Sequence, residues 1–331
     1  MATLETLIGK QRLWLHIALF MVTLFSTAIA GVAWSGHNPL ELENLGYGME
    51  YALLLLLFLS AHEFGHFIAA RIHNVDATLP YYIPFPGTML GIMPNFGTFG
   101  ALIKTRSRMT SKKIVFDIGV AGPIAGFIVC VCILAVGFMT LPGIEYLQNI
   151  HPGYPNVASQ LGNELVFGKT LLYSLFESVF ARSGGYIPPM SEMYHYPMLI
   201  VGWFGLFVTG LNLLPVGQLD GGHLTFSMFS QKIHKYVGIG VAVVLGLISL
   251  PELFISFAST DNFHVPEFFN SLVVPGGSSW IFWVLMIVFF IRFKHPSVDT
   301  DEPLDIRRKL IGYFTILIFV LSFTPSPLVL Q

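Results

Sequence analysis

Residues 51–66 read YALLLLLFLSAHEFGH, an unbroken apolar run that ends in two histidines and a glutamate. Ionisable groups in an apolar helix are costly to place in lipid, so they usually mark a functional site. At helical spacing His62 and His66 lie one turn apart on one face, and both imidazoles can reach one cation. Glu63 beside them cannot join the same coordination geometry, but it can accept a proton from an attacking water. The stretch therefore predicts a zinc hydrolase site within a membrane helix; the alternative is a set of polar side chains that hydrogen-bond across a helix bundle.

The composition is that of an integral membrane protein. Of the 331 residues, 54% are hydrophobic and only 11% are charged, against about 25% charged residues in soluble domains, and the mean hydropathy is +0.69. The net charge of −2 gives no reason to expect nucleic-acid binding. Cys130 and Cys132 lie in one apolar run, which excludes a disulfide framework or a thiolate zinc site and indicates a packing role.

Seven apolar stretches are long enough to approach or cross a hydrocarbon core about 30 Å thick. They are residues 13–34, 49–71, 114–140, 197–215, 236–257, 278–293 and 309–324, of which the last two are short enough to form a shallow hairpin instead. With a cytosolic N-terminus, every Lys and Arg except Lys169 and Arg182 falls on the cytosolic side, as the positive-inside rule requires. We therefore expect an all-α polytopic membrane protein with six to seven transmembrane helices, by default in a prokaryotic cell membrane.

The domain organisation follows from these stretches. We expect residues 1–331 to form one membrane-embedded domain, with a core at about 49–225, a non-cytosolic loop at about 141–196 and accessory C-terminal helices at about 236–324. The apolar middle of the loop, residues 163–180, predicts an amphipathic helix on the membrane surface.

The segment 76–104 is apolar, but its Pro and Gly content forbids a long helix, and residues 97–104 alternate as a strand does. A small re-entrant β-hairpin that lines a cavity is the expected structure, with an ordinary cytosolic loop as the alternative. A free strand edge at 97–104 could pair with the backbone of a substrate.

A catalytic zinc ion usually keeps three protein ligands, so the two histidines need a partner at the same depth. The fourth apolar stretch also runs inward under this topology and ends in NLLPVGQLDGGH, where proline and paired glycines break the helix and let Asp220 project into a cavity. Asp117, at the start of the third stretch, is the rival; its other roles would be to pair with Lys112 or Lys113 or to accept a hydrogen bond from a ligand histidine. We favour Asp220.

These two motifs together resemble the site-2 protease family of intramembrane zinc metalloproteases. HExxH in a membrane helix is followed about 150 residues later by N-x-x-P-x-x-x-L-D-G, present here as Asn212, Pro215, Leu219, Asp220 and Gly221. The chain looks similar to the compact form without PDZ or CBS domains. The resemblance implies that His62, His66 and Asp220 bind one Zn²⁺ per chain, that Glu63 is the general acid/base, and that Asn212 lies near the scissile carbonyl.

The resemblance also implies the activity: cleavage of single-pass transmembrane proteins near the cytosolic face, after an earlier cut outside the membrane. One departure is Gly126, which stands where many members have the Asn of a GPxxN motif. Whatever that Asn does elsewhere is not assumed for this chain.

Two other functions fit the same residues. A membrane metal transporter could use His62, His66 and Asp220 as a transit site, although a transporter would spread its ligands along a path and would not require Glu63. A catalytically silent protein that captures membrane helices is the second, and the intact Glu63 argues against it.

His223 is more typical of a residue beside the metal site or of a loop than of a fourth ligand. The other histidines lie near span ends or in loops, where interfacial or solvated roles are common; they are His16, His37, His73, His151, His195, His234, His264 and His295.

Overall fold

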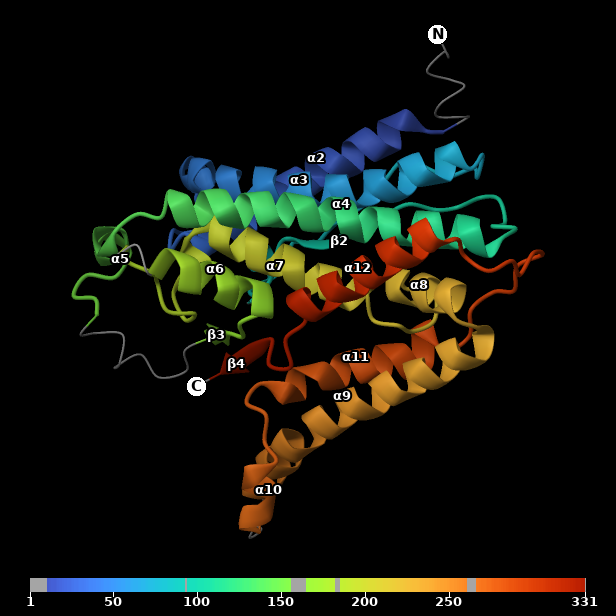
Figure 1. Ribbon diagram of the computed structural model, residues 1–331. Helices are drawn as coiled ribbons and strands as arrows, with labels where there is room; N and C mark the ends of the chain where they lie inside the picture. The colour runs from blue at the N-terminus through green and yellow to red at the C-terminus, as the bar shows by residue number, and fades with distance from the viewer. Residues whose placement is uncertain (1–10, 93, 156–164, 182–184, 261–265, 331) are drawn as a thin grey trace.

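The structure, a computed structural model, describes residues 11–92, 94–155, 165–181, 185–260 and 266–330. It is mainly helical, and neighbouring long helices run in opposite directions (Figure 1). The α-helices are α2 (Leu13–Trp34), α3 (Leu45–Ile72), α4 (Lys112–Met139), α5 (Ile144–Ile150), α6 (Leu171–Ala181), α7 (Pro197–Asn212), α8 (Asp220–Met228), α9 (Gln231–Thr260), α10 (Glu267–Ser271), α11 (Trp280–Met286) and α12 (Ile306–Ser322). The short helical turns are η1 (Leu42–Asn44), η2 (Thr88–Leu90), η4 (Met193–His195), η5 (Gly277–Ser279) and the π-helical η6 (Ile287–Ile291), which continues α11.

Each of the seven predicted apolar stretches contains a helix, but not all of these helices are long enough to cross a membrane. Among the described residues four qualify by length and composition, namely α2, α3 with its preceding turn η1, α4 and α9. The helix α7 has 16 residues and α12 has 17, and these lengths alone are marginal for a core about 30 Å thick. A membrane protein is therefore supported, while the predicted count of six to seven spans is not confirmed.

The helices α2, α3 and α4 pack closely because glycines meet at their crossings. A Cβ added to Gly48 on α3 would lie 1.9 Å from the carbonyl oxygen of Ala28 on α2. Further along α3, a Cβ on Gly65 would lie 2.6 Å from the carbonyl oxygen of Ala121 on α4. Close backbone approach through small residues is the usual way for helices to associate where lipid removes the hydrophobic drive. The glycine of HEFGH thus fixes the motif against α4.

The predicted hairpin is present between α3 and α4. Strands β1 (Tyr81–Pro84) and β2 (Thr98–Leu102) pair antiparallel, with Tyr82 opposite Ala101. The hairpin is held to α2 by the Ser26 hydroxyl, which donates to the carbonyl oxygen of Gly97 at 2.7 Å, and to α3 by a 2.7 Å hydrogen bond between the hydroxyls of Ser60 and Tyr82. In the sheet β2 has one partner strand, β1, among the described residues.

The loop predicted at about 141–196 differs from the expectation. The amphipathic helix expected over residues 163–180 is confined to α6, and the segment before it contains β3 (Leu165–Phe167), which pairs antiparallel with β4 (Leu328–Leu330) near the C-terminus. Residues 163 and 164, and Arg182 in the same loop, lie outside the described residues. A sequence window cannot reveal this strand, because its partner lies more than 150 residues away in the chain.

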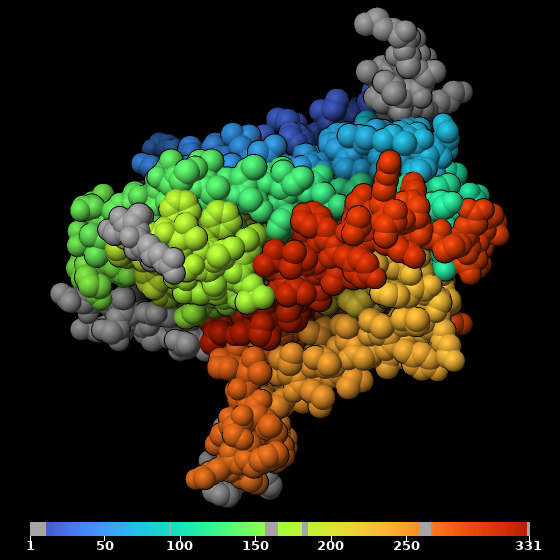
Figure 2. All heavy atoms as spheres, viewed as in Figure 1, coloured from blue at the N-terminus to red at the C-terminus, as the bar shows by residue number. Residues whose placement is uncertain are grey.

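One face of the molecule is built for lipid. The C-terminal end of α9 projects from the molecule with α10 (Figure 2), and only 22% of the apolar window of α9 is buried. Large apolar side chains such as Val244, Leu247 and Phe257 are more than half exposed. In water such a face would be a liability, whereas against acyl chains it needs no cover.

Candidate metal centre

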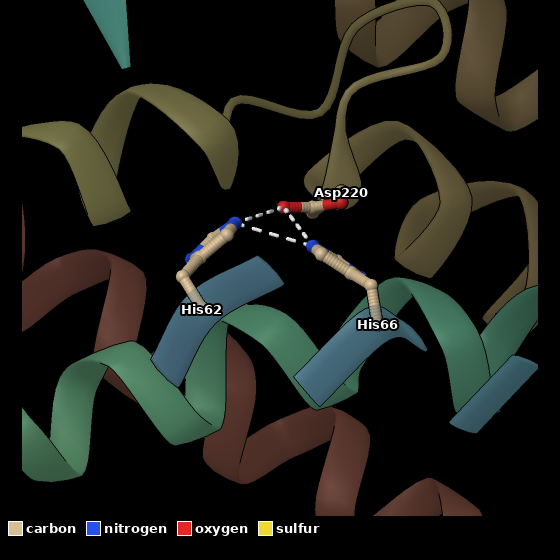
Figure 3. A group of neighbouring side chains, drawn as sticks. All are labelled: His62, His66 and Asp220. Atoms are coloured by element: carbon tan, nitrogen blue, oxygen red, sulfur yellow. Dashed lines mark hydrogen bonds and ion pairs between the residues drawn. The ribbon is translucent and has the colours of Figure 1, made fainter. Parts of the chain in front are cut away.

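The two histidines of α3 meet Asp220 of α8 in the interior of the bundle. The Nε2 atoms of His62 and His66 are 3.2 Å apart, and the Oδ2 atom of Asp220 lies 3.4 Å from each of them (Figure 3). All three side chains are largely buried, with Asp220 the most exposed at 14%. The three expected metal ligands are thus brought together from helices that lie more than 150 residues apart.

The turn between α7 and α8 determines where Asp220 lies. The helix α7 ends at Asn212, three residues before Pro215, and the chain then reverses direction. Gly217 in the reversal has φ +54°, and a Cβ there would lie 2.7 Å from the carbonyl oxygen of Arg292. Only glycine satisfies both demands without strain. The reversal lets α8 begin at Asp220, where the helix dipole favours a carboxylate.

The imidazole of His66 is held in one orientation. Its Nδ1 atom is 2.7 Å from the carbonyl oxygen of Ile118, and because a carbonyl only accepts, Nδ1–H must be the donor. The Nε2 lone pair is therefore left for a metal ion, and such a partner on the second ring nitrogen is usual for metal-binding histidines. Gly122 of α4 makes room for the ring, since a Cβ there would lie 2.1 Å from Nε2.

His62 is less constrained. Its Nδ1 atom is buried and has no hydrogen-bond partner among the described residues. Gly126, which replaces the Asn of the GPxxN pattern, lies beside it, and a Cβ there would lie 3.2 Å from His62 Nδ1. On the other side of the ring, Asn212 Nδ2 is 3.3 Å from His62 Nε2, so the amide of Asn212 lies at the edge of the centre.

The three donor atoms fit a zinc ion. Ligands about 2.0–2.1 Å from a tetrahedral zinc ion are separated by about 3.3 Å from one another, and the observed separations are 3.2, 3.4 and 3.4 Å. Two imidazole nitrogens with one carboxylate oxygen are a donor set typical of catalytic zinc. The roles of these residues as ligands stay a prediction, because the geometry establishes their proximity and not an ion between them.

A cavity of about 320 Å³ opens beside the centre. Glu63 and Asn212 line it together with the three ligand candidates, and Glu63 itself is outside the group of ligand atoms. The same cavity is lined by Ala101 and Leu102 of β2 and by Ile103 just after it. Gln218 and His223 also lie in the cavity wall.

The rival aspartate is engaged elsewhere. Asp117 accepts two hydrogen bonds from Arg308, at 2.8 and 2.6 Å, and pairs with His73 at 2.8 Å. Its predicted partners Lys112 and Lys113 contact Asp301 and Glu302 instead. Asp117 therefore joins α4 to α12 rather than serving the centre, and the arginine was missed because it lies 191 residues further along the chain.

Several of the histidines for which interfacial or solvated roles were expected are buried. His295 and His195 are 6% and 3% exposed. The Nδ1 atom of His295 is 2.7 Å from the carbonyl oxygen of Pro296, so Nδ1–H donates and Nε2 accepts from His223 Nδ1 at 2.7 Å. Burial lowers the pKa of His295 to about 4, so this imidazole is neutral at neutral pH and orients His223 in the cavity wall. His264 lies outside the described residues.

Comparison with known proteins identifies similar chains. Residues 50–250 match the model of the family described as Peptidase family M50. A probable zinc metalloprotease EGY2, chloroplastic, from Oryza sativa subsp. indica is 24% identical over 330 residues, which cover 95% of this chain and 52% of that protein. A probable zinc metalloprotease EGY1, chloroplastic, from Arabidopsis thaliana is 32% identical over 272 residues, covering 73% of this chain and 46% of that protein.

The chain spans about half the length of these curated relatives. Both are plant proteins named chloroplastic, so they do not support the prokaryotic membrane expected from the sequence. No solved structure is significantly similar.

Proposed function

The chain belongs to peptidase family M50, and from that premise we propose that it is a zinc endopeptidase that cleaves single-pass transmembrane proteins within the membrane, near the cytosolic face. The observation that supports this best is the meeting of His62, His66 and Asp220 in a cavity that also contains Glu63 and the edge of β2. A binding site would need only the ligands. A hydrolase also needs a proton acceptor and a place for an extended peptide, and both are beside this centre.

Each residue of the site has a different role in the proposed reaction. Zinc, when bound by the three ligands, would polarise the water and the scissile carbonyl. Glu63 then takes the proton from the attacking water and passes it to the departing amine. The amide of Asn212, 3.3 Å from His62 Nε2, can donate a hydrogen bond to the carbonyl oxygen as negative charge develops on it.

The substrate must be unwound before it can be cut, because each carbonyl of a helix is hydrogen-bonded and shielded by the next turn. Strand β2 could hold an unwound segment of substrate. It has one partner strand among the described residues, and it borders the cavity at Ala101 and Leu102. Added as a third strand, a peptide would form backbone hydrogen bonds along β2. Its scissile bond would then lie beside Glu63.

The location of the cut follows from the topology we propose. With the N-terminus in the cytosol, α3 and α7 both run inward, and His62 lies ten residues before the end of α3 at Ile72, about 15 Å at 1.5 Å per residue. The charge distribution supports this orientation. It also requires α7, α12 and the segment of α11 and η6 to cross alongside the four longer helices. Cleavage would then release a cytosolic fragment, after an earlier cut has shortened the substrate outside.

The decisive test compares Glu63→Gln with Glu50→Gln, an exposed glutamate on the same helix α3. The full chain is purified with zinc, reconstituted in liposomes with a tagged single-span substrate, and assayed for product and for zinc content. We expect Glu50→Gln to cleave as the wild type does, and Glu63→Gln to retain zinc while losing about 10²- to 10⁴-fold in rate, the usual contribution of a general base.

Product formed at the wild-type rate by Glu63→Gln would remove Glu63 from the mechanism and with it the proposal. The same liposomes report on the alternative. Zinc flux across the bilayer without proteolysis by the wild type would identify a metal transporter, whereas a protein that retains the substrate and neither cuts it nor moves zinc would be a binding protein.

A further inference from the structure

A second group of metal-ligand residues lies at the end of the bundle where α5 lies, away from α8 (Figure 1). It consists of His151, Glu192 and His195, none of which the sequence singles out. The Nε2 atoms of the two histidines are 2.9 Å apart, and Glu192 Oε2 is 3.5 Å from each of them. This triangle resembles the one formed by His62, His66 and Asp220, and its sides lie within about 0.4 Å of the spacing of about 3.3 Å between ligands of a tetrahedral zinc ion.

The backbone holds the three residues in place. His151 follows α5 directly, and its amide donates to the carbonyl oxygen of Leu147 at 2.7 Å. Glu192 and His195 lie at the two ends of one turn, where the amide of His195 donates to the carbonyl oxygen of Glu192 at 3.1 Å. The hydroxyl of Tyr146 on α5 donates to the carbonyl oxygen of His195 at 2.7 Å. This hydrogen bond connects the turn to α5.

The imidazole of His195 is oriented as a metal ligand would be. Its Nδ1 atom is 2.7 Å from the carbonyl oxygen of Trp34, the last residue of α2. Because the carbonyl only accepts, Nδ1–H donates, and the Nε2 lone pair points toward His151 and Glu192. The same arrangement orients His66 through Ile118 in the first centre, and it is the usual partner arrangement of metal-binding histidines.

Burial and access also fit an ion. The side chains of His195 and Glu192 are 3% and 8% exposed, whereas that of His151 is 31% exposed. A buried carboxylate counters the charge of a metal ion that is taken out of water, and the partly exposed side chain of His151 gives an ion a way in. The position is distinct from the first centre: α2 near Trp34 crosses α3 at Gly48, and His62 lies about 21 Å further along α3 at 1.5 Å per residue.

We propose that His151, Glu192 and His195 form a second binding site for a divalent metal ion, zinc by its donor set of two imidazoles and one carboxylate, which joins α5 to the turn before α7 and to the end of α2. The chain would then hold two zinc ions rather than the one expected from its family resemblance. The second ion is not on a path to the first, because Leu55 and Phe58, between Gly48 and His62 on α3, are fully buried in the apolar core. Its role is to fix the non-membrane connection between α4 and α7.

The test counts zinc ions on the full chain in detergent. The protein is stripped with a chelator, titrated with zinc salt, and analysed for tightly bound metal by mass spectrometry, with no dependence on peptidase activity. We expect two ions for the wild type and for His37→Ala, a matched control in which a histidine near the end of α2 that stacks on Tyr47 is removed. We expect one ion for His151→Ala and for Glu192→Gln.

The loss of affinity at the second site should exceed the about 10- to 100-fold caused by mutating an outer partner of a metal ligand. Glu192→Gln keeps the size of the side chain and one of its two acceptor oxygens, and His151 is partly exposed, so both variants should elute as the wild type does and keep the first ion. A wild type that binds one ion, or an unchanged count in His151→Ala, would overturn the proposal and leave His151 donating a simple hydrogen bond to His195. Loss of the first ion in Asp220→Asn with retention of the second separates the two sites.

Discussion

Replacing Gly122 with alanine should remove zinc from the first centre without unfolding the protein. The imidazole of His66 lies flat on this glycine: an added Cβ would lie 2.1, 2.4 and 2.5 Å from Nε2, Cδ2 and Cε1 of the ring. Carbon atoms in contact are normally about 3.5–4.0 Å apart. The ring must therefore retreat by more than about 1 Å, while its Nδ1 atom is held 2.7 Å from the carbonyl oxygen of Ile118.

The magnitude follows from the tolerance of a metal site. Ligand distances are kept within about 0.2 Å, and a displacement of about 1 Å at a catalytic site costs about 10²-fold, or about 2.7 kcal/mol. The change from glycine to alanine in a helix favours folding by about 0.8–1.0 kcal/mol, but displacing a buried ring costs about 1–3 kcal/mol. The metal-free protein should therefore lose at most about 2 kcal/mol of stability and stay folded, while zinc binding at the first centre is lost.

The control is Gly126→Ala on the same helix, four residues further. Its Cβ would lie 3.0 Å from Phe58 Cε2 and 3.2 Å from His62 Nδ1, so a shift of a few tenths of an ångström accommodates it. Both variants are purified and measured for zinc per chain, for cleavage of a single-span substrate and for thermal unfolding. We expect Gly122→Ala to hold one zinc ion fewer than Gly126→Ala. If Gly122→Ala binds zinc and cleaves as the wild type does, His66 does not lie against α4 as described.

Three further substitutions separate the metal centre from its supports. Asp220→Asn should lower zinc affinity more than tenfold while changing stability by only about 0.3–1 kcal/mol, the value of a carboxylate in the first turn of a helix; titration with a competing chelator measures the first, and unchanged zinc affinity would exclude Asp220 as a ligand. Asp117→Asn should leave the zinc content unchanged but weaken its pairing with Arg308, which thermal unfolding should register as a loss of about 1.5 kcal/mol or more; loss of zinc instead would return Asp117 to the centre. Tyr82→Phe leaves Ser60 without its 2.7 Å hydrogen bond and should cost about 1 kcal/mol and lower kcat/KM with zinc retained; an unaffected cleavage rate would show that anchoring the hairpin to α3 is unimportant.

The sequence predicted elements whose causes are local. Apolar runs of sufficient length predicted the helices α2, α3, α4 and α9, because lipid requires each helix to satisfy its own backbone hydrogen bonds. Proline and the paired glycines after the fourth apolar stretch predicted the end of α7. The Pro and Gly content of residues 76–104 predicted the hairpin before α4. Local patterns could not predict the pairing of β3 with β4 or the contact of Asp117 with Arg308, since the partners are far apart in the chain and no local pattern joins them.

For the metal centre too, some features follow from the local sequence and others only from tertiary packing. By itself the sequence determined that two histidines on one helix face have a glutamate beside them and an aspartate after a helix break, because helical periodicity and proline fix these features within a few residues. Only the tertiary structure decided that Asp220 reaches both imidazoles, that Gly122 seats His66, and that His151, Glu192 and His195 converge at the other end. Those distances depend on how separate helices and turns pack, and packing is a property of the whole chain rather than of any segment.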